Sequence, residues 1–437
     1  MNFDIDCGAE NIINELRENG YSAYIVGGCI RDTFMHVMPH DWDICTSASP
    51  DDMLRIFSNH KIIDTGSKYG TITVILNNAA YECTTYRSSK REPDDYSNLK
   101  EDLMHRDFTI NAMAYNDKDG LIDLFGGQTD IKNGIIRCTN DPMVRFSEDA
   151  LRIMRALRFS AKYGFSIDPD THLAMINMAD DLKNISAERL NRELCEIISS
   201  PLGADVLHSN PKIICTVIPE LKVSVGFDQK NPYHDFDVFT HTTNALKNCN
   251  STDIITRLAV FFHDIGKPYS MQEDSNGQRH FKGHGSVSAA MTDSIMKKLR
   301  FDNHTRTAVT QLVSYHDANI EPQKKHIRRW LNRIGEIQFR RLLDVHCADI
   351  QGQKTEYDPD RINKIRNVEK ILDEILTEQH CFSIKDLAVN GNDLIKIGIT
   401  PGKQMGMILN DLLIKVINEE IHNDHDSLIN AVNTLIK

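Results

Sequence analysis

The sequence has no paired cysteines, no long apolar run and no apolar leader. Its 10 cysteines are scattered over 437 residues and none forms a Cys-x-x-Cys pair, which argues against a zinc ribbon, a redox motif or a disulfide scaffold. No apolar run approaches the roughly 18 residues that a membrane span needs. The first residues, MNFDIDCGAE, lack the basic and apolar regions of a signal peptide. We therefore expect a protein of the reducing cytoplasm.

The sequence also has no excess of positive charge. Its formal net charge is −12, whereas general nucleic-acid-binding proteins are usually basic. Residues 324–341, KKHIRRWLNRIGEIQFRR, depart from this balance because they are rich in Lys and Arg and contain a single Glu. A solvated helix face and a local site for a polyanion are both compatible with this segment.

The local patterns predict an α/β region followed by a long helical region. Strands are expected at 21–28 and 42–45, and a hairpin over 71–86 with Asn77 and Asn78 in its turn. From residue 145 onward the patterns are helical and are interrupted by Pro, Gly and Asn. A chain of 437 residues with 41% hydrophobic content predicts two to four well-cored domains of α+β class.

The first candidate site lies in YIVGGCIRDTFMHVMPHDWDI, residues 24–44. Gly27 and Gly28 follow a predicted strand, where glycine allows the backbone to turn its N–H groups toward an anion. Arg31 can add a planar set of donors to a phosphate. A strand that ends in two glycines is more often a simple turn, so this pattern alone is weak.

Asp41 and Asp43 strengthen the interpretation. Alternate residues of a strand point to the same face, so their carboxylates would repel each other unless a cation lies between them. Mg²⁺ prefers such oxygen ligands together with substrate phosphates. Glu82, on the later hairpin, is a candidate third carboxylate if the sheet order brings it to the pair. A phosphate-binding turn close to a carboxylate pair describes two-metal nucleotidyl transfer.

Five motifs then occur in order: VGGCIRD, HDWDI, HRDFTINAMAY (105–115), RFSEDALRIMRALRF (145–159) and SAERLNREL (186–194). In these the chain resembles the class II tRNA nucleotidyltransferases, that is, the CCA-adding enzymes and the bacterial poly(A) polymerases. The resemblance implies a polymerase-beta-like nucleotidyltransferase head over 1–140 and a helical neck over 141–225. An HD body over 226–350 and a tRNA-binding tail over 351–437 complete the expected organisation.

The resemblance also assigns roles to residues of the head. It implies Asp41 and Asp43 as catalytic metal ligands, and a nucleotide-binding set consisting of Gly27, Gly28, Arg31, Asp32, Arg106, Asp107 and Asn111. The family usually has two arginines before the aspartate of the third motif, whereas this chain has His105 in the first of these positions.

The fourth motif bears on which nucleotide is used. Asp149 and Arg152 are three residues apart, and on one helix they would share a face. Cytosine and adenine both present an amino donor beside a ring-nitrogen acceptor, which an Asp and an Arg can match; uracil and guanine present the opposite order and would leave buried groups unpaired. The resemblance assigns base selection to this pair, with Arg155 and Arg158 further along the helix near phosphate or RNA. The alternative is a capping acid and a surface ion pair.

One further segment bears on the product. The segment SSKREPDDYSNLK, residues 88–100, is shorter than the resemblance leads us to expect, and a shortened loop is the pattern of enzymes that add only the two Cs. We expect full CCA addition to tRNA from CTP and ATP, with CC addition and poly(A) synthesis as alternatives.

A second candidate site follows in LAVFFHDIGKP, residues 258–268. The chain has five His-Asp pairs, but His263-Asp264 stands out because it ends an apolar helical run, and buried neighbours of this kind usually need a metal ion. The pattern resembles the HD phosphohydrolases, which implies His241, His263, Asp264 and Asp349 as metal ligands. His284 and His316 are candidates for a second metal. The mixed ligands suit Mn, Fe, Ni or Mg.

An HD module could trim phosphate groups from RNA 3′ ends, or it could be a degenerate fold that serves only as the body. A phosphohydrolase with a vestigial head and a non-catalytic RNA-binding protein are further alternatives. The intact residues of the head and the acidic net charge argue against these two.

Overall fold

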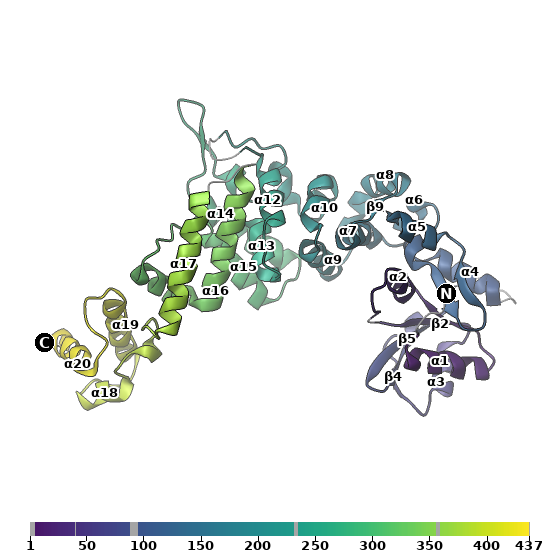
Figure 1. Ribbon diagram of the computed structural model, residues 1–437, viewed down its shortest axis with the longest axis horizontal. Coiled ribbons are helices and arrows are strands. Elements are labelled where there is room, and N and C mark those ends of the chain that lie inside the picture. Colours follow the sequence, from purple (N-terminus) through teal and green to yellow (C-terminus); the bar gives the residue numbers. More distant parts are fainter. Residues whose placement is uncertain (1–4, 40, 88–94, 231–234, 355–358, 437) are drawn as a thin grey trace. The chain divides into compact units, whose positions relative to one another are not determined.

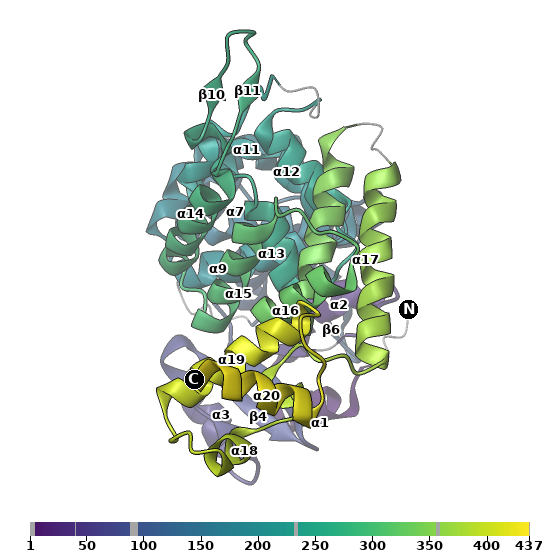
Figure 2. The same cartoon turned by 90° about the vertical axis from the view of Figure 1, so that its left-hand side faces the viewer.

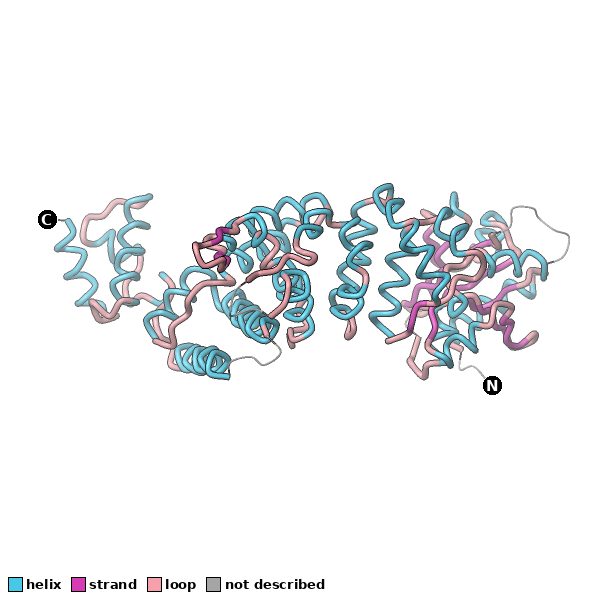
Figure 3. Tube along the Cα trace, turned by 90° about the horizontal axis from the view of Figure 1, so that it is seen from above, coloured by secondary structure: helices cyan, strands magenta, loops and turns pink. Residues whose placement is uncertain are grey.

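The structure is a computed structural model that describes residues 5–39, 41–87, 95–230, 235–354 and 359–436. The chain divides into two compact units. The first unit comprises residues 1–202 and 212–217, and the second comprises residues 203–211 and 218–437. Mixed α/β structure is confined to the first unit and the second is almost entirely helical (Figures 1 and 3). This confirms the expected fold class, while the finer division into four parts stays a prediction.

The first unit is built on a seven-stranded sheet with the order β3-β4-β5-β2-β1-β6-β7. All neighbouring strands are antiparallel except β2 and β5, which are parallel. The strands are β1 (Ala23–Val26), β2 (Asp43–Thr46), β3 (Lys61–Ile63), β4 (Thr71–Leu76), β5 (Ala79–Thr85), β6 (Met113–Asn116) and β7 (Gly120–Asp123). The strands expected at 21–28, 42–45 and in the hairpin are thus confirmed with small shifts of their ends.

The two faces of the sheet are buried by different helices. Ile25 and Ile44 belong to a core that includes side chains of α1 (Cys7–Glu18) and α3 (Pro50–Ile56). The alternate residues Val26 and Cys45 belong to a second core with Leu99 and Leu103 of α4 (Asp95–Met104). Because side chains alternate along a strand, Asp43 lies on the same face as Cys45. The candidate carboxylates therefore lie on the face opposite to α1 and α3.

Helices and short strands complete the first unit after the sheet. They are α2 (Gly28–Phe34), α5 (Gly127–Asn133), β8 (Ile135–Ile136), α6 (Pro142–Glu148), α7 (Leu151–Tyr163), β9 (Ser166–Ile167), α8 (Pro169–Asn177), α9 (Ala187–Ser199) and α11 (Pro211–Val217). Helix α7 packs against α9, and its N-terminal end carries the fourth sequence motif. This packing matters for the candidate site because both helices contribute side chains to it.

The second unit is a helical body that continues into a small C-terminal bundle. Its elements are α10 (Gly203–Ser209), α12 (Val238–Lys247), α13 (Ile254–Phe262), β10 (Gln272–Glu273), β11 (Arg279–His280), α14 (His284–Lys298), α15 (Asn303–Tyr315), α16 (Lys324–Gln353), α17 (Pro359–Thr377), α18 (Gly391–Lys396), α19 (Lys403–Ile417) and α20 (His425–Ile436). Helices α16 and α17 lie side by side, and the β10–β11 hairpin projects from the body (Figure 2). None of the described helices is long and apolar enough to cross a membrane.

The hairpin turn at Asn77 and Asn78 is built from residues with positive φ angles, 49° and 67°. This is the geometry of a two-residue type I′ turn, in which Leu76 pairs with Ala79. Asn tolerates this region of φ/ψ space, whereas a β-branched residue does not.

We expect Asn78→Val to destabilise the first unit by about 1–2 kcal/mol, because a β-branched side chain is strained in the left-handed region. Asn78→Gly is the matched control and should stay within a few tenths of a kcal/mol of the wild type or exceed it. Urea unfolding followed by Trp42 fluorescence in a Trp330→Phe background measures this unit alone. Equal stability of the two variants would contradict the turn assignment.

Candidate active site and candidate metal centre

A polar cleft of about 500 Å³ lies in the first unit, between the sheet and the helices that follow it. It gathers most of the residues that the sequence singled out from both regions. From the head these are Gly27, Gly28, Arg31, Asp43, Glu82, Arg106, Asp107 and Asn111, and from the helices they are Asp149, Arg152, Arg155 and Arg158. Asp41 and Asp32 do not line the cleft.

The glycine turn is required by its backbone conformation, and it lies close to Arg106. Gly27 has φ 83° and ends β1, and a Cβ atom at this position would lie only 2.9 Å from Nη1 of Arg106. Arg106 is itself held by Asp102, which accepts hydrogen bonds from its Nε and Nη2 atoms at 3.3 and 3.2 Å. The turn therefore lets a fixed guanidinium reach the cleft floor.

The carboxylates of Asp43 and Glu82 are neighbours on the floor of the cleft. The parallel pairing of β2 and β5 places Asp43 directly opposite Glu82, so both side chains lie on the same face of the sheet. Desolvation raises the pKa of Asp43, Arg106 opposes this, and the negative charges of Glu82 and Asp41 raise it further. Glu82 is thus a neighbour of Asp43, while its role as a third metal ligand stays a prediction. Asp41 lies two residues before β2 rather than within it.

Arg31 is held firmly rather than projecting as a free cation. Its Nε and Nη2 atoms donate to Oδ1 of Asp32 at 2.9 and 2.7 Å, and its Nη1 donates to Oδ1 of Asn111 at 2.6 Å. The guanidinium also lies 5.2 and 5.0 Å from the ring centroids of Phe159 and Tyr163, at cation–π distance. Asp32 thus acts on the cleft through Arg31.

Asp107 is a buried carboxylate that forms an ion pair with Arg155. It accepts hydrogen bonds from Nε and Nη2 of Arg155 at 2.8 and 2.6 Å, from Nδ2 of Asn111 and from the Phe108 N–H. Burial alone would raise the pKa of Asp107, but the charge of Arg155 and these hydrogen bonds outweigh it and lower the pKa to about 2. Arg158, further along α7, donates to Glu193 of α9 at 2.7 Å.

Asp149 and Arg152 do not share one helix face, so that prediction is wrong. Helix α6 ends at Glu148 and α7 begins at Leu151, and Asp149 lies between them with an extended backbone, φ −155° and ψ 99°. Its Oδ1 accepts a hydrogen bond from the Leu151 N–H at 3.2 Å, which is the capping role that we considered as the alternative. Both residues nevertheless line the same cleft.

Arg152 is anchored by groups on either side of the break. Its Nη1 donates to the Arg145 carbonyl and to Oε2 of Glu148, both at 2.9 Å, and its Nη2 donates to the His105 carbonyl at 2.7 Å. The His105 ring lies near the same network, with Nδ1 3.3 Å from Oε1 of Glu148. His105, at which this chain departs from the family pattern, therefore contacts Glu148, the carboxylate that accepts a hydrogen bond from Arg152.

Sequence reasoning missed Arg189, Phe159, Arg87 and Asp102, which also line the cleft. Arg189 of α9 donates to both oxygens of Asp149, at 3.3 and 2.7 Å. Phe159 of α7 lies within 5.4 Å of the guanidiniums of Arg31, Arg155 and Arg158. Arg189 lies in the motif SAERLNREL, but its partner Asp149 is 40 residues away. No local spacing could therefore have identified the pair.

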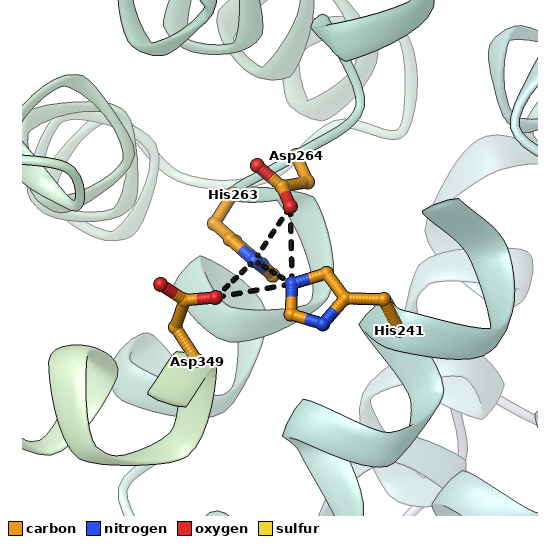
Figure 4. A group of neighbouring side chains, drawn as sticks. All are labelled: His241, His263, Asp264 and Asp349. Carbon is orange, nitrogen blue, oxygen red and sulfur yellow. Dashed lines mark hydrogen bonds and ion pairs between the residues drawn. The ribbon is translucent and has the colours of Figure 1, made fainter. Parts of the chain in front are cut away.

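In the second unit four predicted ligands form one cluster (Figure 4). One ligand atom from each of His241, His263, Asp264 and Asp349 lies within 4.8 Å of all the others. Nε2 of His241 is 3.0 Å from Nε2 of His263 and 3.0 Å from a carboxylate oxygen of each aspartate. Three of the four side chains are buried. These residues come from α12, the end of α13 and α16.

His284 and His316 form a second group that shares Asp264 with the first. Their Nε2 atoms lie 3.2 and 3.4 Å from Oδ1 of Asp264 and 2.9 Å from each other. The Nδ1 atoms of His263, His284 and His316 each lie 2.7–2.8 Å from a backbone carbonyl oxygen. This arrangement turns the Nε2 atoms toward the cluster, as in metal-binding histidines.

Charge and access also suit this cluster to a metal ion. Burial opposes protonation of His263, but the charge of Asp264 and hydrogen bonds to Asp264 and Asp349 raise its pKa to about 10. A cleft of about 500 Å³ opens onto the cluster and carries Lys267, Arg361 and Lys364 in its lining. The six predicted residues are therefore brought together as a candidate metal centre. In the part of the chain that the structure describes, these two groups are the only ones with such spacing.

The sheet, the glycine turn and the carboxylates of the cleft define the first unit as a nucleotidyltransferase head. Residues 23–137 match the family model described as "Poly A polymerase head domain". Residues 164–208 match "Probable RNA and SrmB- binding site of polymerase A", and residues 284–432 match "tRNA nucleotidyltransferase domain 2 putative".

Comparisons over the whole chain are more specific. The chain is 30% identical to the CCA-adding enzyme of Limosilactobacillus fermentum, over 98% of this chain and 97% of the relative. A crystal structure of the Bacillus stearothermophilus CCA-adding enzyme in complex with CTP is similar with a TM-score of 0.70 and 27% identity, covering 98% of this chain and 97% of that one. The Thermotoga maritima CCA-adding enzyme complexed with tRNA shares the fold, with a TM-score of 0.62, 20% identity and coverage of 99% and 96%. The chain belongs to the family of CCA-adding enzymes.

We expect Asp107→Asn to lower the stability of the first unit by about 2 kcal/mol at pH 7, because the folded pKa of about 2 lies below the unfolded value of about 3.9. This contribution is present above about pH 4 and is lost as the pH falls through 2, so the deficit should shrink over that range. Urea unfolding followed by Trp42 fluorescence in a Trp330→Phe background checks it. The exposed Asp170→Asn variant is the control. A deficit that does not change with pH would contradict the assignment.

Proposed function

We propose that this chain adds CMP, CMP and AMP to the 3′ end of tRNA from CTP and ATP, without a nucleic-acid template. The observation that carries the proposal is the single cleft that combines Asp43, Glu82 and Arg106 of the head with Asp149 and Arg152 of the helices. The named relatives support tRNA as the acceptor and CTP and ATP as donors.

The floor of the cleft suits a divalent cation. Two carboxylates in parallel register repel each other, and the raised pKa of Asp43 records that repulsion together with desolvation. We assign Mg²⁺ to Asp41 and Asp43 with Glu82 as a neighbour, since Mg²⁺ prefers carboxylates and substrate phosphates. When bound, the cation would neutralise the triphosphate and activate the attacking 3′-hydroxyl.

The residues of this chain then position the nucleotide. Arg106 presents its charge to the cleft floor, and Asp102 fixes the orientation of that charge. Asn111 and Asp107 support each other and the neighbouring arginines beside the ribose position. Gly27 and Gly28 leave the space that the triphosphate would occupy. Catalysis of this kind depends mainly on positioning and charge neutralisation.

Base selection is assigned to Asp149 and Arg152. The guanidinium has five N–H donors and its anchoring hydrogen bonds use three of them, which leaves two for a base. A donor from Arg152 to the ring nitrogen and an acceptor on Asp149 for the amino group fit cytosine and adenine. Arg189 donates to both oxygens of the Asp149 carboxylate and orients it.

The alternatives are less well supported. Residues 88–94 of the shortened segment lie outside the described residues, and 95–100 belong to α4. Three relatives that match nearly the whole chain are named CCA-adding enzymes. The arrangement of Asp43, Glu82 and Arg106 in one cleft argues against a head that has lost its activity.

The test is to offer tRNA ending at position 73 with CTP alone, ATP alone, UTP alone and CTP with ATP, and to sequence the products. We expect CCA from the CTP–ATP mixture. Asp43→Asn should reduce transfer at least about 100-fold, in the range of losing an electrostatic catalytic group. Asp149→Ala with Arg152→Ala should retain metal-dependent transfer and incorporate UMP.

The exposed Arg192→Ala variant is the control for changes on the helices near the cleft. A product that ends at CC or carries a poly(A) tail would select one of the alternatives. Absence of all incorporation would refute the transferase, and undetectable UMP incorporation by the double variant would refute the pairing argument.

A second activity is proposed for the His–Asp cluster of the second unit. The convergence of His241, His263, Asp264 and Asp349, with His284 and His316 beside them, fits one or two divalent ions of the Mn, Fe, Ni or Mg type. A bound ion would act as a Lewis acid that activates water for attack on phosphorus. Lys267, Arg361 and Lys364 would hold the phosphate. We propose hydrolysis of 3′-phosphate or 2′,3′-cyclic phosphate ends of RNA.

RNA carrying a 3′-phosphate should lose inorganic phosphate in a metal-dependent reaction with the wild type, and His263→Ala and Asp264→Ala should abolish the release. His280→Ala, which changes an exposed histidine of β11 outside the cluster, should leave it unchanged. Activity that survives both cluster variants, or that is absent from the wild type with each of the four metals, would reduce this site to a structural role.

A further inference from the structure

The Lys and Arg residues of the basic segment 324–341 fall into two groups, those with a carboxylate partner and those without one. Many of its cations have a carboxylate within 3.0 Å. The pairs are Lys324 with Glu378, Arg328 with Glu419, Arg340 with Asp373 and Arg341 with Asp253. These pairs neutralise most of the positive charge that is visible in the sequence. The charge that remains available is therefore more localised than the segment suggests.

Arg329 and Arg333 have no carboxylate within 4.0 Å among the described residues. Arg329 is exposed and donates from Nε and Nη2 to the side-chain oxygen of Asn418, which is neutral. Arg333 is exposed and its guanidinium lies 5.3 Å from the ring centroid of Trp330 and 5.7 Å from that of Tyr315. With His326 and Trp330 they line a pocket of about 200 Å³. We name these four residues the α16 cationic surface.

The surface is fixed in place by aromatic packing. Trp330 is stacked on the buried Phe339, with ring centroids 6.1 Å apart and an interplanar angle of 4°, and it meets Tyr315 edge-on at 5.2 Å. Residues 326, 329, 330 and 333 are spaced by three and four, so they share one face of α16. A guanidinium that already lies over a fixed ring loses little freedom when it binds a ligand.

We propose that the α16 cationic surface binds the ribose–phosphate backbone of the RNA substrate. The guanidiniums of Arg329 and Arg333 would contact phosphate oxygens, and a ribose or an unpaired base would pack against Trp330 and Arg333. The pocket holds one phosphate or sugar but not a nucleoside triphosphate. Arginine over an aromatic ring is a recurrent surface for nucleic acid, because it offers planar donors and a stacking face together.

The net charge of −12 restricts where RNA can bind. An acidic chain repels a polyanion over most of its surface, so the backbone can approach where neighbouring cations have no acidic partners. An acidic peptide would meet the same charges, but it would make no use of the stacked ring beside them. The choice of tRNA as the RNA rests on the proposed function.

The first test measures the affinity of the full chain for tRNA over a series of salt concentrations. We expect Arg329→Ala with Arg333→Ala to raise Kd about 10-fold near physiological salt and to reduce the slope of log K against log salt by about 1–2, since each lost phosphate contact removes about 0.9. Arg340→Ala is the matched control, because it removes an exposed cation that lies beyond the kink of α16 at Gly335 and already has carboxylate partners. It should stay within about 2-fold of the wild type.

The second test isolates the ring. The chain has two tryptophans, so Trp42→Phe leaves Trp330 as the only one. Addition of tRNA should quench its fluorescence, and Trp330→Phe should bind more tightly than Trp330→Ala because it keeps a stacking face. Unchanged affinity and slope in the double arginine variant, or unchanged Trp330 emission at saturating tRNA, would overturn the proposal.

The two proposals can fail independently. In the transfer assay the double arginine variant should show a raised KM for tRNA with kcat and the KM for CTP unchanged. A wild type that transfers CMP, combined with a variant that binds tRNA normally, refutes only the α16 cationic surface. Loss of tRNA affinity in the variant without any transfer by the wild type refutes only the proposed function.

Discussion

The parallel pairing of β2 with β5 sets the central constraint of the first unit. It places Asp43 and Glu82 next to each other on one face of the sheet, which is unfavourable unless positive charge comes close. Arg106 lies close to Gly27, whose positive φ favours glycine, and Asp102 fixes Arg106 in turn. Four further arginines of the cleft are likewise tied to carboxylates, namely Arg31 to Asp32, Arg155 to Asp107, Arg152 to Glu148 and Arg158 to Glu193. The cleft is thus a set of mutually oriented charges into which a cation and a triphosphate fit.

Much of the head could be predicted from sequence because its signals are local. The strand before Gly27 and the Asn77-Asn78 turn depend on neighbours within a few residues, and both appear in the structure. Asp41, which was expected on one strand with Asp43, precedes that strand instead. The position of Glu82 needed the strand order, which a sequence without homologues does not contain. The structure supplied that order and placed the two carboxylates together.

The errors and omissions have a common physical origin. Asp149 and Arg152 were expected on one helix because their spacing fits one, but the local pattern does not show that the backbone at Asp149 is extended. Arg189 and Phe159 act through partners far along the chain, and the stacked residues of α16 become visible only when Tyr315, Trp330 and Phe339 are in contact. By contrast, the six His and Asp residues of the second unit could be identified from sequence, because a family pattern fixes their identity even though they span more than 100 residues.

The extended backbone at Asp149 affects how readily this residue can be substituted without loss of stability. A residue within a helix is bound to the packing of that helix, so altering it disturbs the core on which it lies. Asp149 lies in a two-residue break and is partly exposed, and its partner Arg189 of α9 is half exposed. Asp149 is therefore largely separate from the atoms that hold the fold together, whereas Arg152 is buried in α7 and anchored on both sides of the break. A substitution at Asp149 should cost little stability, while one at Arg152 would disturb the packing of α6 and α7.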